Sequence, residues 1–286
     1  MYVCGQKKLL SEIDQLIESN AFPRFSIIVG NVGTGKKVIS DYIARKLGAN
    51  FVPSGIKAEE VRDVIDNSYT VIEKTLYMFA DSDYMSVTSK NSLLKVTEEP
   101  PNNSYFIMTV RDLSNVLETI ISRAMIFHIE PYSESDLDDF ITHKNYSIDS
   151  AKRKILKQIC LCPQDITVAS DIDIKAVYDV ADKFIQFIGS ANLANELKIS
   201  TMLNLKSSDS DKSDKIDPII FMRCIMLCCN SMMLDNISAE DAKIFHSIIS
   251  ETSRSLIALQ SKGCNKQEVV DNWIVSTHMA ITGGEF

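Results

Sequence analysis

The sequence predicts an α/β protein in which helices cover a parallel sheet, followed by a C-terminal half made of helices. Three observations lead to this fold class. A glycine-rich turn at residues 30–37 separates a short apolar run from a helical segment. Apolar runs and helical segments then alternate as far as residue 129, which is typical of a parallel sheet with helices on both faces. From Pro131 onward the helical patterns continue without a convincing strand.

The first half of the chain supplies four predicted strands, each a short run of apolar residues: 25–29, 75–80, 105–110 and 125–129. Its predicted helices repeat apolar residues at intervals of three or four: 6–19, 38–47, 58–67, 86–99 and 113–121. Pro100 and Pro101 end the helix at residues 86–99, because proline cannot donate the backbone hydrogen bond that a helix needs.

The second half supplies only predicted helices: 135–142, 150–161, 173–188, 192–205, 218–233, 239–260 and 266–280. Between two of them, residues 206–217 form a polar low-complexity stretch, which predicts a mobile loop. We interpret the last four residues, G-G-E-F, as a frayed tail.

Length and composition indicate ordinary globular material. The chain has 286 residues, of which 45% are hydrophobic and 24% charged, enough for two or three domains. The net charge of −8 argues against non-specific coating of nucleic acid and leaves room for a local basic surface. The absence of a membrane-length apolar run and of an export signal predicts a soluble, cytoplasmic protein.

The seven cysteines are odd in number and form no C-x-x-C pair, so we expect reduced thiols. Cys224 and Cys228 lie four positions apart on a predicted apolar helix, where a zinc site is conceivable. Buried thiols are the favoured reading, because cysteine packs as a small hydrophobic residue. We therefore expect no metal site formed by cysteine.

The turn G-N-V-G-T-G-K-K fits a phosphate-binding P-loop, since it follows a predicted strand and precedes a predicted helix. Its backbone N–H groups, the positive end of the helix and the Lys36 ammonium would together cradle the phosphates of a nucleotide. Lys37 stands where a serine or threonine hydroxyl would bind Mg²⁺, so metal-assisted hydrolysis is in question. The alternative is a glycine-rich turn with surface lysines. The residues predicted to bind nucleotide here are Gly30, Gly33, Thr34, Gly35, Lys36 and Lys37.

The strand predicted at residues 75–80 ends in an acidic segment, D-S-D. P-loop proteins hold Mg²⁺ with a carboxylate at such a strand end. Asp81 is therefore a candidate for this role, and the alternative is that it merely begins a turn.

The segment from residue 81 to residue 124 contains D-S-D-Y-M-S, N-S-L-L-K, E-E-P-P, F-I-M-T-V and T-I-I-S-R-A in this order. The series resembles the AAA+ subunits of DNA polymerase sliding-clamp loaders, whose motifs are D-E-A-D-x-M-T, N-A-L-L-K-x-L-E-E-P-P, F-I-L-x-T and T-I-x-S-R-C. The match covers residues 5–129 strongly. Within the family the chain looks most like the bacterial delta-prime subunits of DNA polymerase III, whose P-loop often ends in G-K-K.

The resemblance implies a RecA-like AAA+ domain at residues 1–130, a helical lid at 131–188 and a helical collar at 189–286. Such loaders are five-subunit assemblies that use ATP to open a ring-shaped clamp and close it around primed DNA. The implied partners are other loader subunits, the clamp and DNA, and the implied cofactor is ATP or ADP, with the role of Mg²⁺ left open. Residues 37–80 contain no cysteine, so the zinc module of many bacterial loader subunits is absent.

The chain departs from the pattern of an active ATPase. One alignment of the acidic segment puts Ala80 and Asp81 at the metal-binding and catalytic carboxylates, and the other puts Asp81 and Ser82 there. Neither alignment gives an aspartate-glutamate pair. The lid segment at residues 162–165 lacks the arginine that an active subunit offers to the phosphates, and Thr109 matches the sensor position only after a shift of one residue.

The resemblance assigns one basic residue a role outside its own nucleotide site. Arg123 corresponds to the arginine of S-R-C, which projects towards the ATP of a neighbouring subunit, where a guanidinium stabilises charge on the transferred phosphate. Its alternative is a surface ion pair. Arg62 and Lys90 are weaker candidates for contact with DNA, with solvated helix surface as an equal alternative.

Three functions follow. The leading hypothesis is a delta-prime-like assembly subunit that binds nucleotide, hydrolyses little of it and lends Arg123 to a neighbour. The second is a catalytically active ATPase motor subunit of a loader. The third is a stand-alone P-loop phosphotransferase, which the helical C-terminal half and the E-E-P-P motif disfavour.

Overall fold

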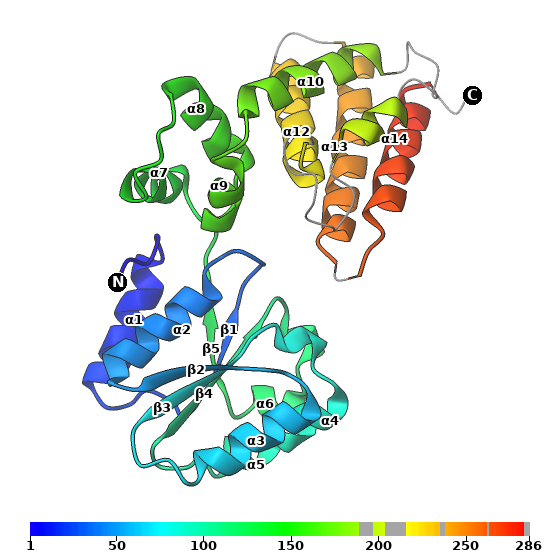
Figure 1. The fold of residues 1–286 in the computed structure, drawn as a ribbon. Helices are drawn as coiled ribbons and strands as arrows, with labels where there is room; N and C mark the ends of the chain where they lie inside the picture. The colour runs from blue at the N-terminus through cyan, green and yellow to red at the C-terminus, as the bar shows by residue number, and fades with distance from the viewer. Residues whose placement is uncertain (189–196, 204–215, 235–237, 262, 283–286) are drawn as a thin grey trace. The chain divides into compact units, whose positions relative to one another are not determined.

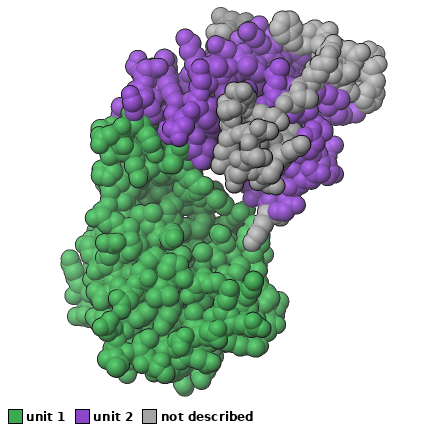
Figure 2. Space-filling model, in the orientation of Figure 1, with its two compact units in different colours: residues 1–146, 161–167 green, residues 147–160, 168–286 purple. Residues whose placement is uncertain are grey.

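The structure is a computed structural model that describes residues 1–188, 197–203, 216–234, 238–261 and 263–282. The chain divides into two units (Figure 2). Unit 1 comprises Met1–Tyr146 and Leu161–Thr167, and unit 2 comprises Ser147–Cys160 and Val168–Phe286. Three predicted features fall wholly or largely outside the described residues: the first part of the helix at 192–205, most of the loop at 206–217, and the C-terminal tail. The division into three domains at residues 130 and 188 remains a prediction.

Unit 1 is built on one parallel sheet of five strands in the order β2-β3-β4-β1-β5 (Figure 1). The strands are β1 (Phe25–Val29), β2 (Asn50–Ser54), β3 (Thr75–Phe79), β4 (Ser104–Val110) and β5 (Met125–His128). The four predicted strands are confirmed within one residue at each end, and the predicted parallel arrangement is confirmed as well. The central strands are apolar along their length because helices cover both faces of the sheet.

The sequence analysis missed β2, the strand at one edge of the sheet. It pairs with β3 on one side, and three of its five residues are exposed. Pro53 lies within it, which an edge strand tolerates because one side makes no hydrogen bonds to a neighbouring strand. Exposure and an internal proline remove the apolar signal on which the other strands were recognised.

Helices of unit 1 lie close to their predicted positions, with two differences. The helix predicted at 86–99 is broken at Leu93, whose backbone makes a tighter turn by donating to the Lys90 carbonyl. The segment predicted at 113–121 divides into a 3₁₀ turn and a single helical turn. The helices and 3₁₀ turns that lie wholly in unit 1 are α1 (Lys7–Glu18), α2 (Lys36–Leu47), α3 (Ala58–Ser68), η1 (Ser82–Tyr84), α4 (Val87–Ser92), α5 (Leu94–Glu98), η2 (Leu113–Asn115), α6 (Glu118–Ile121) and α7 (Glu134–His143).

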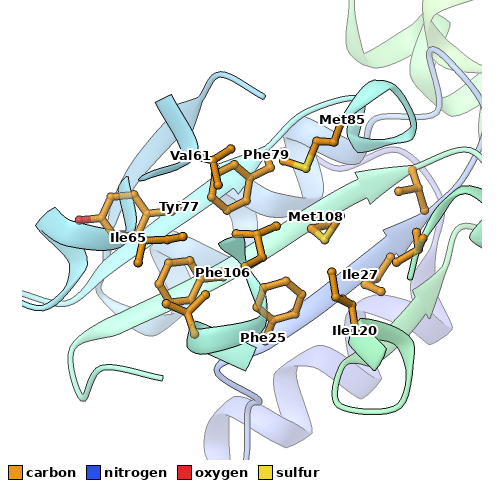
Figure 3. Packing of buried hydrophobic residues seen from close by; sticks show 14 residues of the cluster. Phe25, Ile27, Val61, Ile65, Tyr77, Phe79, Met85, Phe106, Met108 and Ile120 are labelled. Carbon is orange, nitrogen blue, oxygen red and sulfur yellow. The ribbon is translucent and has the colours of Figure 1, made fainter. Parts of the chain in front are cut away.

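Alternate residues of the strands build two separate cores, one on each face of the sheet. On β3, Leu76 and Met78 pack with α1 and α2, whereas Tyr77 and Phe79 pack with α3, α5 and α6. Figure 3 shows the second of these clusters, in which Phe106 of β4 stacks against Tyr77 and Phe25. This two-residue alternation fixes the register of the sheet, because a slip by one residue would exchange the two faces.

Unit 2 consists of helices around an aromatic centre, as predicted for the C-terminal half. Trp273 is buried, packs against Phe184 and Phe221, and donates its indole N–H to Thr252 Oγ1 at 2.9 Å. Its helices are α8 (Ser150–Ile159), α10 (Ile174–Phe187), η3 (Leu197–Met202), α12 (Pro218–Leu234), α13 (Ala239–Leu259) and α14 (Lys266–Thr282). A further helix, α9 (Pro163–Ala169), begins in unit 1. None of the helices in the described residues combines the length and apolar character needed to cross a membrane.

The cysteines of α12 lie in this core. Cys224, Cys228 and Cys229 are buried free thiols, and burial raises the pKa of Cys224 to about 12. Across the described part of the chain, histidines, cysteines and carboxylates form no group of three or more able to hold a metal ion. Because they are buried, these thiols pack as small apolar side chains of α12.

Candidate nucleotide site and arginine

The P-loop connects β1 to α2 at the carboxyl edge of the sheet. Its first residue continues the sheet pairing, because the Gly30 N–H donates to the Val110 carbonyl of β4 at 3.0 Å. Gly33 and Gly35 have φ angles of +81° and +83°, which residues with a Cβ rarely adopt. The turn therefore requires glycine at these two positions, and it delivers the chain directly into the first turn of α2.

Lys36 turns its side chain back over the P-loop. Its ammonium donates to the carbonyls of Gly30 at 2.6 Å and Asn31 at 2.8 Å, and the residue is only 9% exposed. Burial lowers the pKa of Lys36, while the negative charges of Asp81 and Asp83 oppose that shift. The loop thus holds a buried cation whose hydrogen bonds go to its own backbone.

The other P-loop residues differ in their contacts. Thr34 Oγ1 donates to the Asn31 carbonyl at 2.7 Å, and the Thr34 carbonyl accepts from the Tyr132 hydroxyl at 2.7 Å. Lys37 is exposed at the start of α2. The position that would supply a hydroxyl to a metal therefore carries a solvated cation.

A cavity of about 730 Å³ opens beside the P-loop, wholly within unit 1. Its lining includes Gly33, Gly35 and Lys36 of the P-loop and the ends of β3 and β4. The N-terminal residues 2–4, α7 and the first residues of α9 complete it. Tyr2, one of these residues, stacks on His143 with ring centroids 3.7 Å apart. The cavity therefore combines the cation of Lys36 with aromatic and apolar side chains.

The acidic segment lies at the same edge of the sheet, just past β3. Ala80 is the first residue after the strand, and both Ala80 and Asp81 line the cavity. Asp81 has a left-handed backbone with a φ of +51°, and its N–H donates to Thr109 Oγ1 at 3.2 Å. Thr109 is buried on β4 and also lines the cavity. The structure thus brings Asp81 and Thr109 together beside the P-loop.

Asp83, the second acidic residue of D-S-D, has a different environment. Its carboxylate accepts from the backbone N–H of Arg111 at 2.9 and 3.0 Å and from that of Asp112 at 3.4 Å. It therefore ties the end of β4 to the turn after β3. This carboxylate supports the backbone around Asp81 and Thr109.

Residues that follow α8 in sequence close over the P-loop. A Cβ atom at Gly33 would lie 2.8 Å from both Cys162 Sγ and Gln164 Cβ. Cys162 Sγ lies 3.8 Å from the Val32 carbonyl, and burial raises the pKa of this thiol to about 11. The segment predicted to lack an arginine therefore packs against the P-loop through a neutral thiol and an amide side chain.

Arg123 lies far from this cavity, in the segment that leads into β5 of the same sheet. It immediately follows α6 and precedes β5, whereas the P-loop follows β1. In a parallel sheet these positions lie at opposite ends of the strands. A four-residue strand at about 3.3 Å per residue separates them by about 13 Å. The Arg123 side chain is 41% exposed, and its guanidinium pairs with Glu98 at 3.1 Å.

The two predicted DNA contacts have unlike environments. Arg62 is exposed on α3. Lys90 is buried on α4, and its ammonium donates to the carbonyl of Asn115. Lys90 thus ties α4 to η2, whereas Arg62 faces solvent.

Sequence reasoning missed three aromatic side chains from distant segments. The Tyr132 hydroxyl donates to the Thr34 carbonyl of the P-loop, and Tyr2 and His143 line the same cavity. None belongs to a spaced motif, and only the fold brings them to the cavity. The segment at residues 162–165 was singled out for lacking an arginine, but its close contact with Gly33 was not predicted. Gly33 is a local signal of the contact with residues 162 and 164, because a glycine can mark a close approach of another segment.

Comparison with known proteins gives a partial sequence match. A family model described as DNA polymerase III, delta subunit, matches residues 50–133. The DNA polymerase III subunit gamma of Buchnera aphidicola subsp. Schizaphis graminum is 27% identical over 172 residues, covering 49% of this chain and 47% of that protein. The DNA polymerase III subunit delta' of Bacillus subtilis is 29% identical over 79 residues, covering 28% of this chain and 24% of that protein. The chain thus spans half or less of the length of these relatives.

A solved structure extends the likeness over the whole chain. The DNA polymerase III gamma subunit-related protein of Thermotoga maritima superposes with a TM-score of 0.53 at 12% identity, covering 96% of this chain and 99% of that chain. Identity at this level speaks to the fold alone. The fold is RecA-like AAA+ with a helical C-terminal part, as the sequence predicts.

Gly33→Ala should destabilise unit 1 more than Gly48→Ala. Both glycines have a positive φ, so each alanine should cost about 1–2 kcal/mol in backbone strain. A Cβ at Gly48 meets nothing within 4 Å, whereas one at Gly33 would press on Cys162 and Gln164 and add about 1–3 kcal/mol. Urea unfolding followed by circular dichroism measures both losses of stability. Tryptophan fluorescence would not report on unit 1, because the single tryptophan lies in unit 2. Equal losses would show that α9 does not pack on the P-loop in solution.

Proposed function

We propose that this chain, a member of the AAA+ subunits of DNA polymerase sliding-clamp loaders, acts as a delta-prime-like subunit. It binds nucleotide weakly or structurally, hydrolyses little of it, and supplies Arg123 to the ATP of a neighbouring subunit. The observation that carries the proposal is the separation of its two parts. The P-loop has lost groups needed for metal and hydrolysis, while an exposed arginine remains at the opposite edge of the sheet.

The cavity beside the P-loop suits a nucleotide. Its volume of about 730 Å³ falls within the usual range of about 300–1,000 Å³ for ligand pockets. Lys36 and the P-loop N–H groups would hold the phosphates, and the aromatic and apolar side chains that residues 2–4 and α7 contribute to the lining would hold the base. Binding must exchange the Lys36 bonds to Gly30 and Asn31 for bonds to phosphate. This exchange supports weak rather than tight binding.

The residues present do not fit a complete P-loop magnesium site. Lys37 replaces the hydroxyl ligand, and Ala80 carries no carboxylate at the first position after β3. Asp81 lines the cavity together with Lys36, whereas the Asp83 carboxylate is bonded to the backbone of Arg111 and Asp112. This donor set supports binding that depends little on metal.

The proposed contact with DNA involves Arg62 on α3. Arg62 is the candidate that is free to reach outward, since the Lys90 ammonium is already bonded to a backbone carbonyl. Contacts with the sliding clamp and primed DNA, a pentameric assembly and a collar at residues 189–286 belong to the same proposal. They are supported by the resemblance to loader subunits.

A catalytically active motor subunit is the second candidate. The match to a gamma subunit is longer than the match to a delta-prime subunit, at 172 residues against 79. Against it stand Lys37, Ala80 and the lack of an arginine at residues 162–165. ATP turnover by the isolated chain distinguishes the two candidates.

ATP and ADP should bind the isolated chain with similar affinity in Mg²⁺ and in EDTA, because the metal ligands are missing. Lys36→Ala should weaken binding by about tenfold to a hundredfold, the range for a hydrogen bond to a charged group. Isothermal titration calorimetry measures this, with Lys46→Ala as a control at the other end of α2. Failure of both nucleotides to bind the unaltered chain would remove the nucleotide site from the proposal.

The isolated chain should turn over ATP far more slowly than about 1 s⁻¹, the lower end of the usual enzyme range. Loss of one preorganised charge-stabilising group reduces the rate by about 10²–10³-fold, and several are lost here. Phosphate release under saturating ATP and Mg²⁺ is the measurement. Steady turnover near 1 s⁻¹ would favour the motor subunit instead.

Arg123→Ala should leave folding and assembly intact and depress the DNA-stimulated ATPase of a loader reconstituted with its native partner subunits. An exposed ion pair contributes little to stability, whereas trans-acting arginines contribute about 10³–10⁵ in rate at the interface they serve. Arg123→Lys should restore little, because an ammonium lacks the planar fork that binds two phosphate oxygens.

The matched control for Arg123 is Arg45→Ala, which removes another exposed, ion-paired arginine of unit 1. It should leave the rate unchanged. If loaders with arginine or alanine at position 123 hydrolyse ATP and load clamps at the same rate, with assembly verified, the subunit's role is architectural.

A further inference from the structure

The Arg123 guanidinium is held by its own chain in this structure. Nη2 lies 3.1 Å from Glu98 Oε1, and Nη1 donates to the Thr119 carbonyl at 2.9 Å. A longer contact of 3.4 Å joins Nη1 to the Ser122 hydroxyl. Both terminal nitrogens, which form the fork that recognises phosphate, therefore already have partners.

The backbones that carry this pair are anchored in one core. Val96 of α5 and Ile120 of α6 are both fully buried in the cluster of Figure 3. The N–H groups of Arg123 and Ala124 donate to the Ile120 carbonyl at 3.1 and 3.0 Å. Only the outer parts of the Glu98 and Arg123 side chains are thus free to rearrange without disturbing packed residues.

The two side chains are exposed to a similar degree, 41% for Arg123 and 55% for Glu98. A pair this exposed is weak, because water and salt screen the attraction and both side chains lose rotamer freedom. A nucleotide phosphate carries more negative charge than a carboxylate and accepts from the same fork. The pair is therefore strong enough to orient the guanidinium and weak enough for a phosphate to displace the carboxylate.

We infer that Glu98 is a positioning residue, the resting counter-ion of Arg123, and that it competes with the neighbouring subunit's nucleotide for the guanidinium. This inference rests on the proposed function, in which Arg123 acts in trans. Glu98 keeps the arginine extended along the surface between α5 and α6 while the neighbouring site is empty. When ATP binds there, the guanidinium leaves Glu98, and the anchored backbone keeps it within reach.

The test is Glu98→Gln in the reconstituted loader. Removing the competing charge should raise kcat/KM for DNA-stimulated ATP hydrolysis by about 1.5-fold to fivefold, the strength of an exposed ion pair. The gain should shrink as salt rises from about 0.05 to 0.5 M, because the competition is electrostatic. Glu99→Gln, which removes the adjacent exposed carboxylate, should change nothing. A fall in kcat/KM, or an equal gain with Glu99→Gln, would overturn the inference.

Combining Glu98→Gln with Arg123→Ala separates this inference from the proposed function. If Glu98 acts only through Arg123, the Gln substitution should have no effect once the arginine is gone. An effect that persists would assign Glu98 a role independent of Arg123 and overturn the inference. If Arg123→Ala itself has no effect, the proposed function fails. If Arg123→Ala is damaging and Glu98→Gln equals the unaltered loader, only the role of Glu98 fails.

Discussion

The position of β1 inside the sheet, hydrogen-bonded to β4 on one side and β5 on the other, is the constraint on which the rest of unit 1 depends. Because all the strands are parallel, the turns after β1, β3 and β4 meet at one edge. The P-loop, Asp81 and Thr109 come together there. The same geometry puts the segment before β5, with Arg123, at the other edge. One pairing pattern thus places the P-loop and Arg123 at opposite ends of the strands.

The edge that carries the P-loop satisfies its polar groups from within the chain. The Lys36 ammonium bonds to the loop's own carbonyls, the Thr34 carbonyl accepts from Tyr132, and Cys162 packs against Val32. A buried cation without such partners would be costly, because burial removes its hydration. The loop is therefore stable with its side chains turned inward. Any ligand that bonds to the Lys36 ammonium must compete with these internal bonds.

Much of the fold could be predicted because its signals are local. Four strands and most helices follow from apolar periodicity, and the P-loop follows from glycines and a lysine between strand and helix. The edge strand β2 could not be predicted in this way, since exposure and Pro53 remove its apolar pattern. The break at Leu93 was equally hidden, because leucine favours helix and only the backbone hydrogen bond from Leu93 to the Lys90 carbonyl shows the tighter turn.

The site was predictable to the extent that it consists of one motif. Lys36, Asp81 and Thr109 were singled out from sequence and line one cavity, yet Tyr132 and Cys162 reach the P-loop from more than 90 residues away in sequence. The environment of Lys90 shows the same limit. A lysine on a helix resembles a surface cation in sequence, and only the fold reveals that its ammonium is bonded to the Asn115 carbonyl. Contacts between distant segments carry no periodic signal.

In the proposed function, the distance between the P-loop and Arg123 allows the chain to lack one activity and keep the other. Lys37 and Ala80, which carry neither the hydroxyl nor the carboxylate of a metal site, both line the cavity. Lys37 is exposed, and Ala80 packs against the cluster with Leu76 and Met78 on one face of the sheet. Arg123 depends instead on α5 and α6, whose Val96 and Ile120 are buried beneath it in the cluster with Phe79 and Phe106. Substitution at the first edge leaves that cluster unchanged. The arginine can therefore keep its position whether or not its own chain retains a working metal site, which is the physical basis for treating the two edges as independent parts of one subunit.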